Sequence, residues 1–252
     1  LPVADFNVSN NCLNTPTTFT DASLLASQWF WDFGGNTSAL QNPVYIYSAT
    51  GNYTVSLIVT SLNGCKDTVT KVITVYPLPV ANFMADSVCI YTPTSFTNLS
   101  SVTSGIITGW RWDFGDGSPT NTTQNPTHVY TVTGSYTVTL ITITDNGCES
   151  SIALSVIVYP QPVAAFTYSP STIVELGNPV LFTDQSYSNI NQWYWNFGDN
   201  TPAESSQNPT HTYAGEGYYK VSLTVWTNNG CQETYSDVVA VGDVTYSCYS
   251  EF

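Results

Sequence analysis

Positive charge is nearly absent from this sequence. Its 252 residues include 4 lysines and arginines against 18 aspartates and glutamates, a formal net charge of −14 at pH 7. Such a surface repels phosphate backbones, so we exclude nucleic acid as a partner. Charged residues of either sign make up only 9% of the chain, far below the ~25% of ordinary soluble proteins. Polar uncharged residues provide the solubility instead, which is typical of secreted β proteins.

Long apolar runs are also missing. No segment reaches the ~18 apolar residues of a membrane span, so we predict no direct membrane insertion. There is no signal peptide and the first residue is Leu1, so we interpret the chain as a mature form or a fragment of something longer. Hydrophobic residues still make up 42% and aromatic residues 14%, enough to fill several small cores.

Three internal repeats run through the chain. An Asn-Gly-Cys tripeptide recurs twice at a spacing of 83 residues, ending at Cys65, Cys148 and Cys231. A Gln-Asn-Pro tripeptide keeps the same spacing, starting at Gln41, Gln124 and Gln207. A third marker, Trp-Asp/Asn-Phe-Gly, starts at Trp31, Trp112 and Trp195. The chain is therefore built from three copies of one structural unit.

Apolar and polar residues alternate within each repeat. Tyr53, Val55, Leu57 and Val59 face one way, and this period of two indicates a half-buried strand. The third marker has the same period, so we predict a core formed by Trp31, Phe33, Trp112, Phe114, Trp195 and Phe197. Short strands about ten residues apart, separated by turns rich in glycine and asparagine, predict an all-β sandwich.

Proline-rich junctions separate the repeats at residues 76–79 and 159–162. We predict three domains at 1–78, 79–161 and 162–241, followed by a tail or the start of a further segment at 242–252. Two prolines in four residues stiffen a junction and keep adjacent strands from merging. Three sandwiches end to end would then form a rod of about 100–120 Å.

The second repeat carries Trp112 to Gly117 as W-D-F-G-D-G, Asn125 to Tyr130 as N-P-T-H-V-Y, and a G-x-Y-x-V-x-L strand from Gly134. Over about residues 1–241, these motifs in register resemble the PKD (polycystic kidney disease) domain family. The resemblance implies seven-stranded immunoglobulin-like sandwiches in extracellular arrays for adhesion, for carbohydrate or protein contacts, or for spacing. The Asn-Gly-Cys ending also resembles arrays on Bacteroidetes-type surface proteins, some of them exported by type IX secretion.

The six cysteines suit an oxidising compartment. Zinc is disfavoured, because there is no C-x-x-C spacing and histidine is scarce. The first two repeats hold two cysteines each at matching positions, whereas the third lacks the earlier one. We predict the disulfides Cys12–Cys65, Cys89–Cys148 and Cys231–Cys248. For the last two cysteines, half-bonds to parts of the protein outside this sequence are the alternative.

Two sets of side chains are candidates for chemistry. Asp113 and Asp116 could hold calcium, since carboxylates in a tight turn suit a hard cation; otherwise they cap the turn. His128 and His211 share a repeat position with Tyr45, which favours a packing role. Without a catalytic constellation in the sequence, we predict that the chain is not an enzyme and needs no cofactor, calcium apart.

Surface candidates lie elsewhere. Trp226 and Tyr218 in the third repeat could stack on a sugar ring, with a domain-junction contact as the ordinary alternative. Thr68 and Ser87 fit a short Asp-Ser/Thr-apolar pattern of O-glycosylation.

We expect a non-enzymatic structural and adhesive segment of a long cell-surface protein or filament. It would act as a rigid, disulfide-stapled spacer and interaction scaffold. Its expected partners are neighbouring domains of the same or identical chains and cell-surface or environmental polysaccharide. The second hypothesis is a carbohydrate-binding accessory region of a secreted hydrolase. A third is assembly into a polymer through exposed sheet edges.

Overall fold

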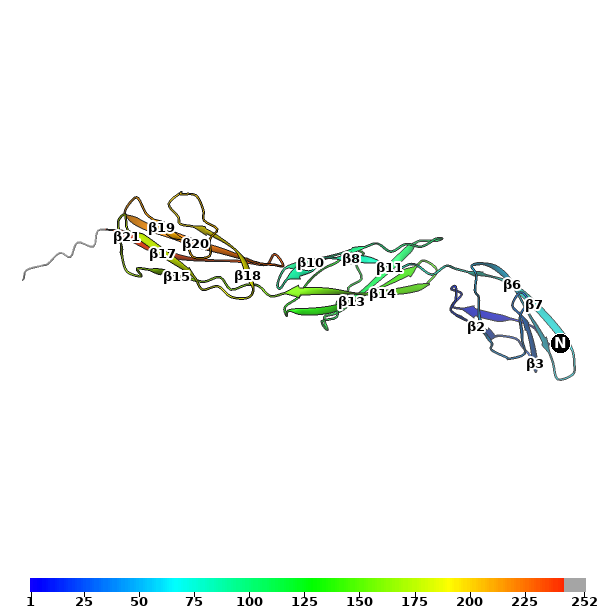
Figure 1. The fold of residues 1–252 in the computed structure, drawn as a ribbon. Coiled ribbons are helices and arrows are strands. Elements are labelled where there is room, and N and C mark those ends of the chain that lie inside the picture. Colours follow the sequence, from blue (N-terminus) through cyan, green and yellow to red (C-terminus); the bar gives the residue numbers. More distant parts are fainter. Residues whose placement is uncertain (243–252) are drawn as a thin grey trace, which may run out of the picture. The chain divides into compact units, whose positions relative to one another are not determined.

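A computed structural model describes residues 1–242, which form β-strands and connecting loops (Figure 1). Two compact units divide the chain. The first comprises Leu1–Ala85, Ser95–His128 and Tyr136–Ser155, and the second comprises Asp86–Thr94, Val129–Ser135 and, of the described residues, 156–242. Within the described part, no helix is long and apolar enough to cross a membrane.

The first sandwich pairs a three-stranded sheet, ordered β1-β2-β5, with a four-stranded sheet, ordered β4-β3-β6-β7. The two sheets meet through aromatic rings, and the ring centroids of Phe6 and Trp31 lie 5.1 Å apart. Its strands are β1 (Phe6–Ser9), β2 (Pro16–Asp21), β3 (Gln28–Asp32), β4 (Thr37–Ser38), β5 (Val44–Ile46), β6 (Gly51–Thr60) and β7 (Lys66–Val75).

The second sandwich has sheets ordered β12-β10-β8 and β11-β13-β14-β9. Phe83 and Trp112 repeat the aromatic contact between the sheets, again at 5.1 Å. Its strands are β8 (Phe83–Ala85), β9 (Val88–Cys89), β10 (Pro93–Asn98), β11 (Ile107–Asp113), β12 (Thr127–Val129), β13 (Gly134–Thr144) and β14 (Glu149–Tyr159).

The third sandwich has sheets ordered β15-β17-β19 and β16-β21-β20-β18. Phe166 and Trp195 make the same contact at 5.1 Å. Its strands are β15 (Phe166–Ser169), β16 (Val174–Glu175), β17 (Pro179–Asp184), β18 (Ile190–Asn196), β19 (Thr210–Thr212), β20 (Gly217–Thr227) and β21 (Gln232–Gly242). The expected all-β fold of three tandem immunoglobulin-like sandwiches is confirmed.

The predicted aromatic core is also confirmed. All three tryptophans of the Trp-Asp/Asn-Phe-Gly marker are fully buried, and the phenylalanines are at most 3% exposed. These residues are Trp31, Phe33, Trp112, Phe114, Trp195 and Phe197. Each indole also reaches a loop carbonyl, as in the 2.9 Å hydrogen bond from Trp31 Nε1 to the Leu40 oxygen. Burial and a satisfied N–H together fix the side-chain position, because an unpaired buried donor is costly.

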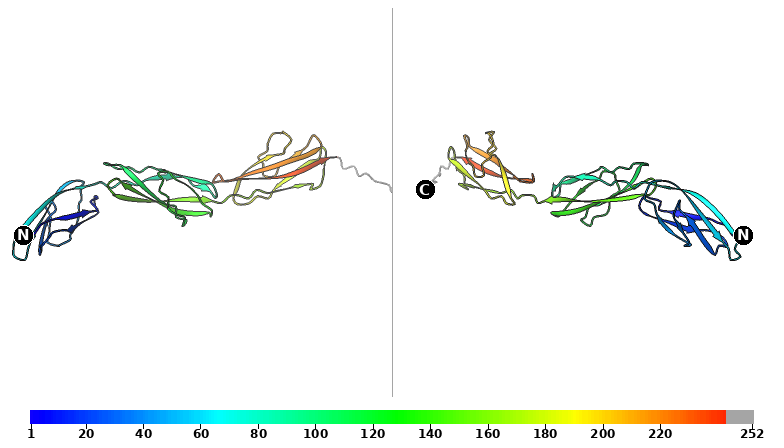
Figure 2. Two further views of the ribbon diagram at one scale, coloured as in Figure 1. Left: turned by 180° about the vertical axis from the view of Figure 1, so that it is seen from behind. Right: turned by 45° about the vertical axis from the view of Figure 1, so that its right-hand side comes forward.

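Each sandwich contains one long hairpin with two distinct ends. In the β6–β7 hairpin, Thr60 lies opposite Lys66 next to the Asn-Gly-Cys turn, and Gly51 lies opposite Val75 at the other end. We call these the turn end and the junction end, the latter leading into the proline-rich junction. Figure 2 shows the corresponding β20–β21 hairpin, in orange and red, running along the third sandwich. At ~3.4 Å per residue, a ten-residue strand separates the two ends by about 34 Å.

Candidate functional site

The cysteines fall at opposite ends of these hairpins. Cys12 forms an isolated parallel bridge with Tyr76, and Cys89 pairs in parallel with Tyr159, so both lie at junction ends. The Asn-Gly-Cys cysteines lie at turn ends. The Cα atoms of a disulfide are about 4.4–6.8 Å apart, so a bond cannot span the ~34 Å between the ends of one sandwich.

The predicted pairings are therefore wrong. Cys12 is bonded to Cys148 and Cys89 to Cys231, with Cα atoms 5.7 Å apart in both pairs. The bonds span sequence separations of 136 and 142 residues. Each one joins the junction end of one sandwich to the turn end of the next. The disulfides are joints between repeats and not staples within them.

Two cysteines remain outside these joints. Cys65, which we had paired with Cys12, is free and exposed. Cys248, predicted to pair with Cys231, lies outside the described residues, and Cys231 is already bonded to Cys89. In the third sandwich Glu175 pairs with Gly242 at the junction end, where the other repeats place a cysteine.

The Trp-Asp/Asn-Phe-Gly marker ends in a turn, and the Asp or Asn of the marker caps this turn. Asp113 Oδ1 accepts a 2.9 Å hydrogen bond from the Gly115 N–H. Gly115 has φ +76°, and an added Cβ would lie 2.4 Å from the carbonyl oxygen of Thr137. Both facts require glycine here, because other residues rarely adopt this φ and none fits beside that backbone.

The histidines hold the second part of the same turn. His128 Nε2 lies 2.7 Å from Asp116 Oδ2, and its ring stacks on Phe114 with centroids 4.2 Å apart. His211 repeats the arrangement with Asp199, again at 2.7 Å. Its ring stacks on a phenylalanine at 4.0 Å.

The first repeat reaches the same result with different residues. Tyr45 stacks on Phe33 with centroids 4.8 Å apart. Its hydroxyl accepts a 2.6 Å hydrogen bond from the side-chain amide of Asn36. The predicted packing role of this position is confirmed, because both residue types stack on the buried phenylalanine and tether the turn.

The calcium candidates are engaged within this turn. Burial raises the pKa of Asp116, but hydrogen bonds from Ser118 and His128 outweigh it and hold the pKa below the ordinary value. Its Oδ1 accepts from the Ser118 N–H and hydroxyl, and its Oδ2 faces His128. This donor set fits a turn cap better than a cation. Among residues 1–242, no group of three His, Cys, Asp or Glu side chains could hold a metal ion.

Sequence reasoning missed a polar cluster on the first sandwich. Asp21 Oδ2 accepts hydrogen bonds from Trp29 Nε1 at 2.7 Å and from Gln41 Nε2 at 3.1 Å. The Asp21 N–H donates to Asn42 Oδ1 at 2.8 Å. The cluster explains the Gln-Asn-Pro motif, because Gln41 and Asn42 both bond to Asp21. The repeat of the motif is visible in the sequence, but its contact with Asp21 is not. In the third sandwich, Asp184 makes the same contacts.

The second sandwich lacks the carboxylate of this cluster. Asn98 stands in its place and keeps the backbone bond, donating its N–H to Asn125 Oδ1 at 2.8 Å. Its Oδ1 accepts from the Ser100 N–H, which leaves the amide nitrogen on the other side. Trp110 Nε1 is buried without a hydrogen-bond partner. By alignment with Asp21 and Asp184, we infer that the Asn98 amide nitrogen takes the place of the carboxylate oxygen that accepts the indole N–H in the other repeats.

The two proposed sugar-stacking residues are not brought together. Strand alternation places Trp226 and Tyr218 on one face of β20, but eight residues apart, about 27 Å. Tyr218 is 84% exposed, whereas Trp226 is half-buried. On the neighbouring strand β18, Gln192 lies opposite Trp226. Tyr194 lies two residues further along β18, opposite Thr224 and on the same face of the sheet. Tyr194 is therefore the nearer aromatic partner for Trp226.

Both candidate glycosylation residues, Thr68 and Ser87, are exposed. A hydroxyl at the surface is accessible to a modifying enzyme. The modification itself stays a prediction.

These features define the class of molecule: tandem immunoglobulin-like sandwiches joined end to end by disulfides. The chain belongs to the PKD domain family, whose model matches residues 2–75, 77–158 and 159–241. PKD domains are non-catalytic modules.

Curated relatives share only part of this array. Collagenase ColA of Bacillus cereus is 37% identical over 71 residues, which cover 28% of this chain and 7% of the relative. The pre-pro-metalloprotease PrtV of Vibrio cholerae is 31% identical over 140 residues, 54% of this chain and 15% of the relative. The chain therefore spans a small fraction of the length of these relatives.

Solved PKD domains match single repeats. The PKD1 domain of Vibrio anguillarum Epp is 30% identical, covering 33% of this chain and 95% of that one, with a TM-score of 0.31. The PKD1 domain of Vibrio cholerae metalloprotease PrtV is 35% identical, covering 32% and 98%, also with a TM-score of 0.31.

Proposed function

We propose that this chain is a non-enzymatic, extracellular structural and adhesive segment of a long cell-surface protein or filament. It acts as a stiff spacer that holds other binding elements at a distance. The observation that carries the proposal is the pair of disulfides between consecutive sandwiches. A bond at the turn end adds a second covalent link beside the proline-rich junction, and two links restrict a joint far more than one.

Small-angle X-ray scattering tests the spacer. We expect the oxidised chain to give one narrow distribution of interatomic distances with a fixed maximum dimension. Cys12→Ser combined with Cys148→Ser should broaden that distribution and leave circular dichroism unchanged, because each sandwich keeps its own core. Identical scattering from the oxidised chain and the double variant would show that the disulfides do not stiffen the array.

The adhesive part needs a separate measurement. The adhesive proposal, with type IX secretion as the proposed export route, predicts binding to cell surfaces or to identical chains and no hydrolysis of substrates. Quantitative binding of the labelled chain to source cells, with heat-unfolded chain as the control, tests it. An absence of binding would reduce the function to spacing alone.

A second candidate is an accessory region of a secreted hydrolase. The relatives named as a collagenase and a metalloprotease favour it, since PKD domains occur there beside other parts of a longer enzyme. In this role Trp226 and Tyr194 would stack on a polymeric substrate. Pull-down on insoluble polysaccharide and insoluble collagen tests it, with Trp226→Ala expected to abolish capture and Tyr218→Ala, on the distant part of β20, to preserve it.

A further inference from the structure

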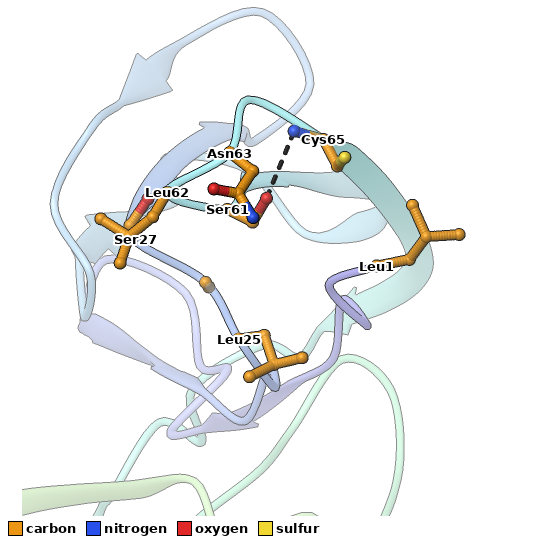
Figure 3. A pocket seen from close by; sticks show the side chains of 8 residues that line it. Leu1, Leu25, Ser27, Ser61, Leu62, Asn63 and Cys65 are labelled. Carbon is orange, nitrogen blue, oxygen red and sulfur yellow. Dashed lines mark hydrogen bonds between the residues drawn. The ribbon is translucent and has the colours of Figure 1, made fainter.

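The free thiol of Cys65 belongs to a turn that is already built like the two bonded turns. The Gly64 N–H donates to the Ser61 carbonyl at 3.0 Å, and Gly147 and Gly230 make the same bond at 2.9 and 3.0 Å. The φ angles of these three glycines are +78°, +77° and +79°. The Cys65 N–H also donates to Ser61 Oγ at 3.2 Å, the bond drawn in Figure 3. The turn therefore presents its thiol as the other two do.

The environment of the three cysteines differs in one respect. Cys148 is 0% and Cys231 1% exposed, whereas Cys65 is exposed. Beside the Cys12–Cys148 bond, Leu78 and Pro16 line a pocket together with Cys12 and with Gly147 of the turn. Cys65 has no such cover among the described residues.

An apolar hollow of about 350 Å³ lies beside Cys65. Its walls come from three segments, namely the N-terminus, residues 25–27 and the Asn-Gly-Cys turn (Figure 3). Leu1 and Leu62 are more than 90% exposed and Leu25 is 75% exposed. At the position of Leu62 the other two turns carry Asp145 and Asn228. The first sandwich thus has the most apolar turn end of the three, and that end is uncovered.

We propose that Cys65 is half of a third joint of the same kind. Its partner is the junction-end cysteine of another PKD-type sandwich that precedes Leu1 in the same polypeptide. That sandwich carries the pattern Phe-x5-Cys-x3-Pro, which Phe6 to Pro16 and Phe83 to Pro93 share here. Its junction end covers the apolar hollow and buries Cys65. The inference rests on the repeated joint and holds whether or not the array acts as a spacer.

Formation of the bond follows thiol–disulfide exchange. The two cysteine thiols lose two protons and two electrons as their sulfurs join. A disulfide-carrying oxidoreductase of the extracytoplasmic compartment accepts the electrons and becomes a dithiol.

A second copy of this chain does not offer the required partner. Its cysteines at junction ends, Cys12 and Cys89, are already bonded. Its third sandwich has Glu175 at that position. A second copy therefore has no free cysteine at the junction-end position that the two joints use, and a preceding sandwich with a cysteine there is the occupant that fits. A link from Cys65 to Cys248 of another copy is the competing outcome that the test must separate.

The test adds one repeat to the full chain. Residues 78–160 placed directly before Leu1 recreate the Tyr-Pro-Leu-Pro sequence of the first junction. The added copy carries Ser87→Thr as a mass label and Cys148→Ser to remove its own free turn-end thiol. Air-oxidised protein is alkylated without reduction, digested and analysed by mass spectrometry. A chain in which the added Cys89 is also serine is the matched control.

We expect the labelled Cys89 peptide to be linked to the Cys65 peptide and Cys65 to escape alkylation. The intact mass before alkylation should be that of a chain with three disulfides, two hydrogens below that of the same chain with two. In the control, Cys65 should be fully alkylated while both other joints form. Alkylated Cys65 in the four-repeat chain, with both other joints intact, would overturn the proposal. So would a Cys65–Cys65 or Cys65–Cys248 link between chains. In the polypeptide isolated from its source, Cys65 should be linked to a peptide with the Phe-x5-Cys-x3-Pro pattern.

Discussion

Asn98→Asp should stabilise the second sandwich. The substitution replaces the side-chain amide nitrogen with a carboxylate oxygen, the atom that at the matching position accepts the indole N–H at 2.7 Å in the other two sandwiches. Trp110 Nε1 is buried and unpaired, so the substitution turns an unsatisfied donor into a charge-assisted hydrogen bond.

The size of the effect follows from the same comparison. A hydrogen bond to a charged group contributes about 1.5–3 kcal/mol, and an unpaired buried donor costs about 1–3 kcal/mol. Because residue 98 is half-buried, solvent screens the new charge and the lower end applies. We expect a gain of about 1–2 kcal/mol in the free energy of unfolding. Asp184→Asn, the reverse change in the third sandwich, should lose a similar amount.

Hydrogen exchange read peptide by peptide separates the three sandwiches. Amides of β11 and β13 should exchange about 5- to 30-fold more slowly in Asn98→Asp, since 1.4 kcal/mol corresponds to tenfold. Asn82→Asp is the matched control, because it adds the same charge at an exposed site of the same sandwich. Equal protection in Asn98→Asp and Asn82→Asp would refute the reasoning, and so would a loss of protection in Asn98→Asp.

Three further predictions concern the third sandwich and are read by the same exchange measurement. Gly198→Ala should destabilise it by about 3 kcal/mol or more, because φ is +80° and the new Cβ would lie 2.5 Å from the Lys220 oxygen, whereas Gly230→Ala, with similar φ and open space, should cost about 1–2 kcal/mol. His211→Ala should cost about 2 kcal/mol through lost stacking and an unpaired Asp199, whereas His211→Tyr, the residue type of the first repeat, should cost under ~1 kcal/mol. Burial raises the pKa of Asp199, but its hydrogen bonds outweigh burial and hold the pKa below 3.8. The ionised Asp199 therefore stabilises the third sandwich above pH 3.8, and this stabilisation is lost as the pH falls through the lowered pKa. Unchanged protection of the third sandwich between pH 5 and pH 3 would contradict this prediction.

Much of the fold could be predicted because the alternation of apolar and polar residues along the chain determines the strands. Alternation of apolar residues gave the strands, and the marker from Trp31 to Gly34 gave the buried core. The shared position of Tyr45 and His128 correctly indicated packing, since only a stacking role tolerates that exchange. These features depend on residues that are close in sequence or repeated in register.

The disulfides and the polar cluster depend on information of another kind. Alignment of the repeats shows that Cys12 and Cys65 belong to one sandwich, but it does not show that a ten-residue hairpin separates them. Asp21 and Trp29 meet across strands, and nothing in their spacing marks the contact. The sheet register decides both, because it fixes which end of a strand each side chain occupies.

The register also explains why the cysteines serve joints and not cores. A bond inside a sandwich would add stability to a core that Trp31 and its equivalents already fill. A bond from a junction end to the next turn end instead removes freedom that neither core can control. In the third sandwich Glu175 stands at this position, so the residues that the structure describes supply no cysteine for a joint of this kind at the third junction end.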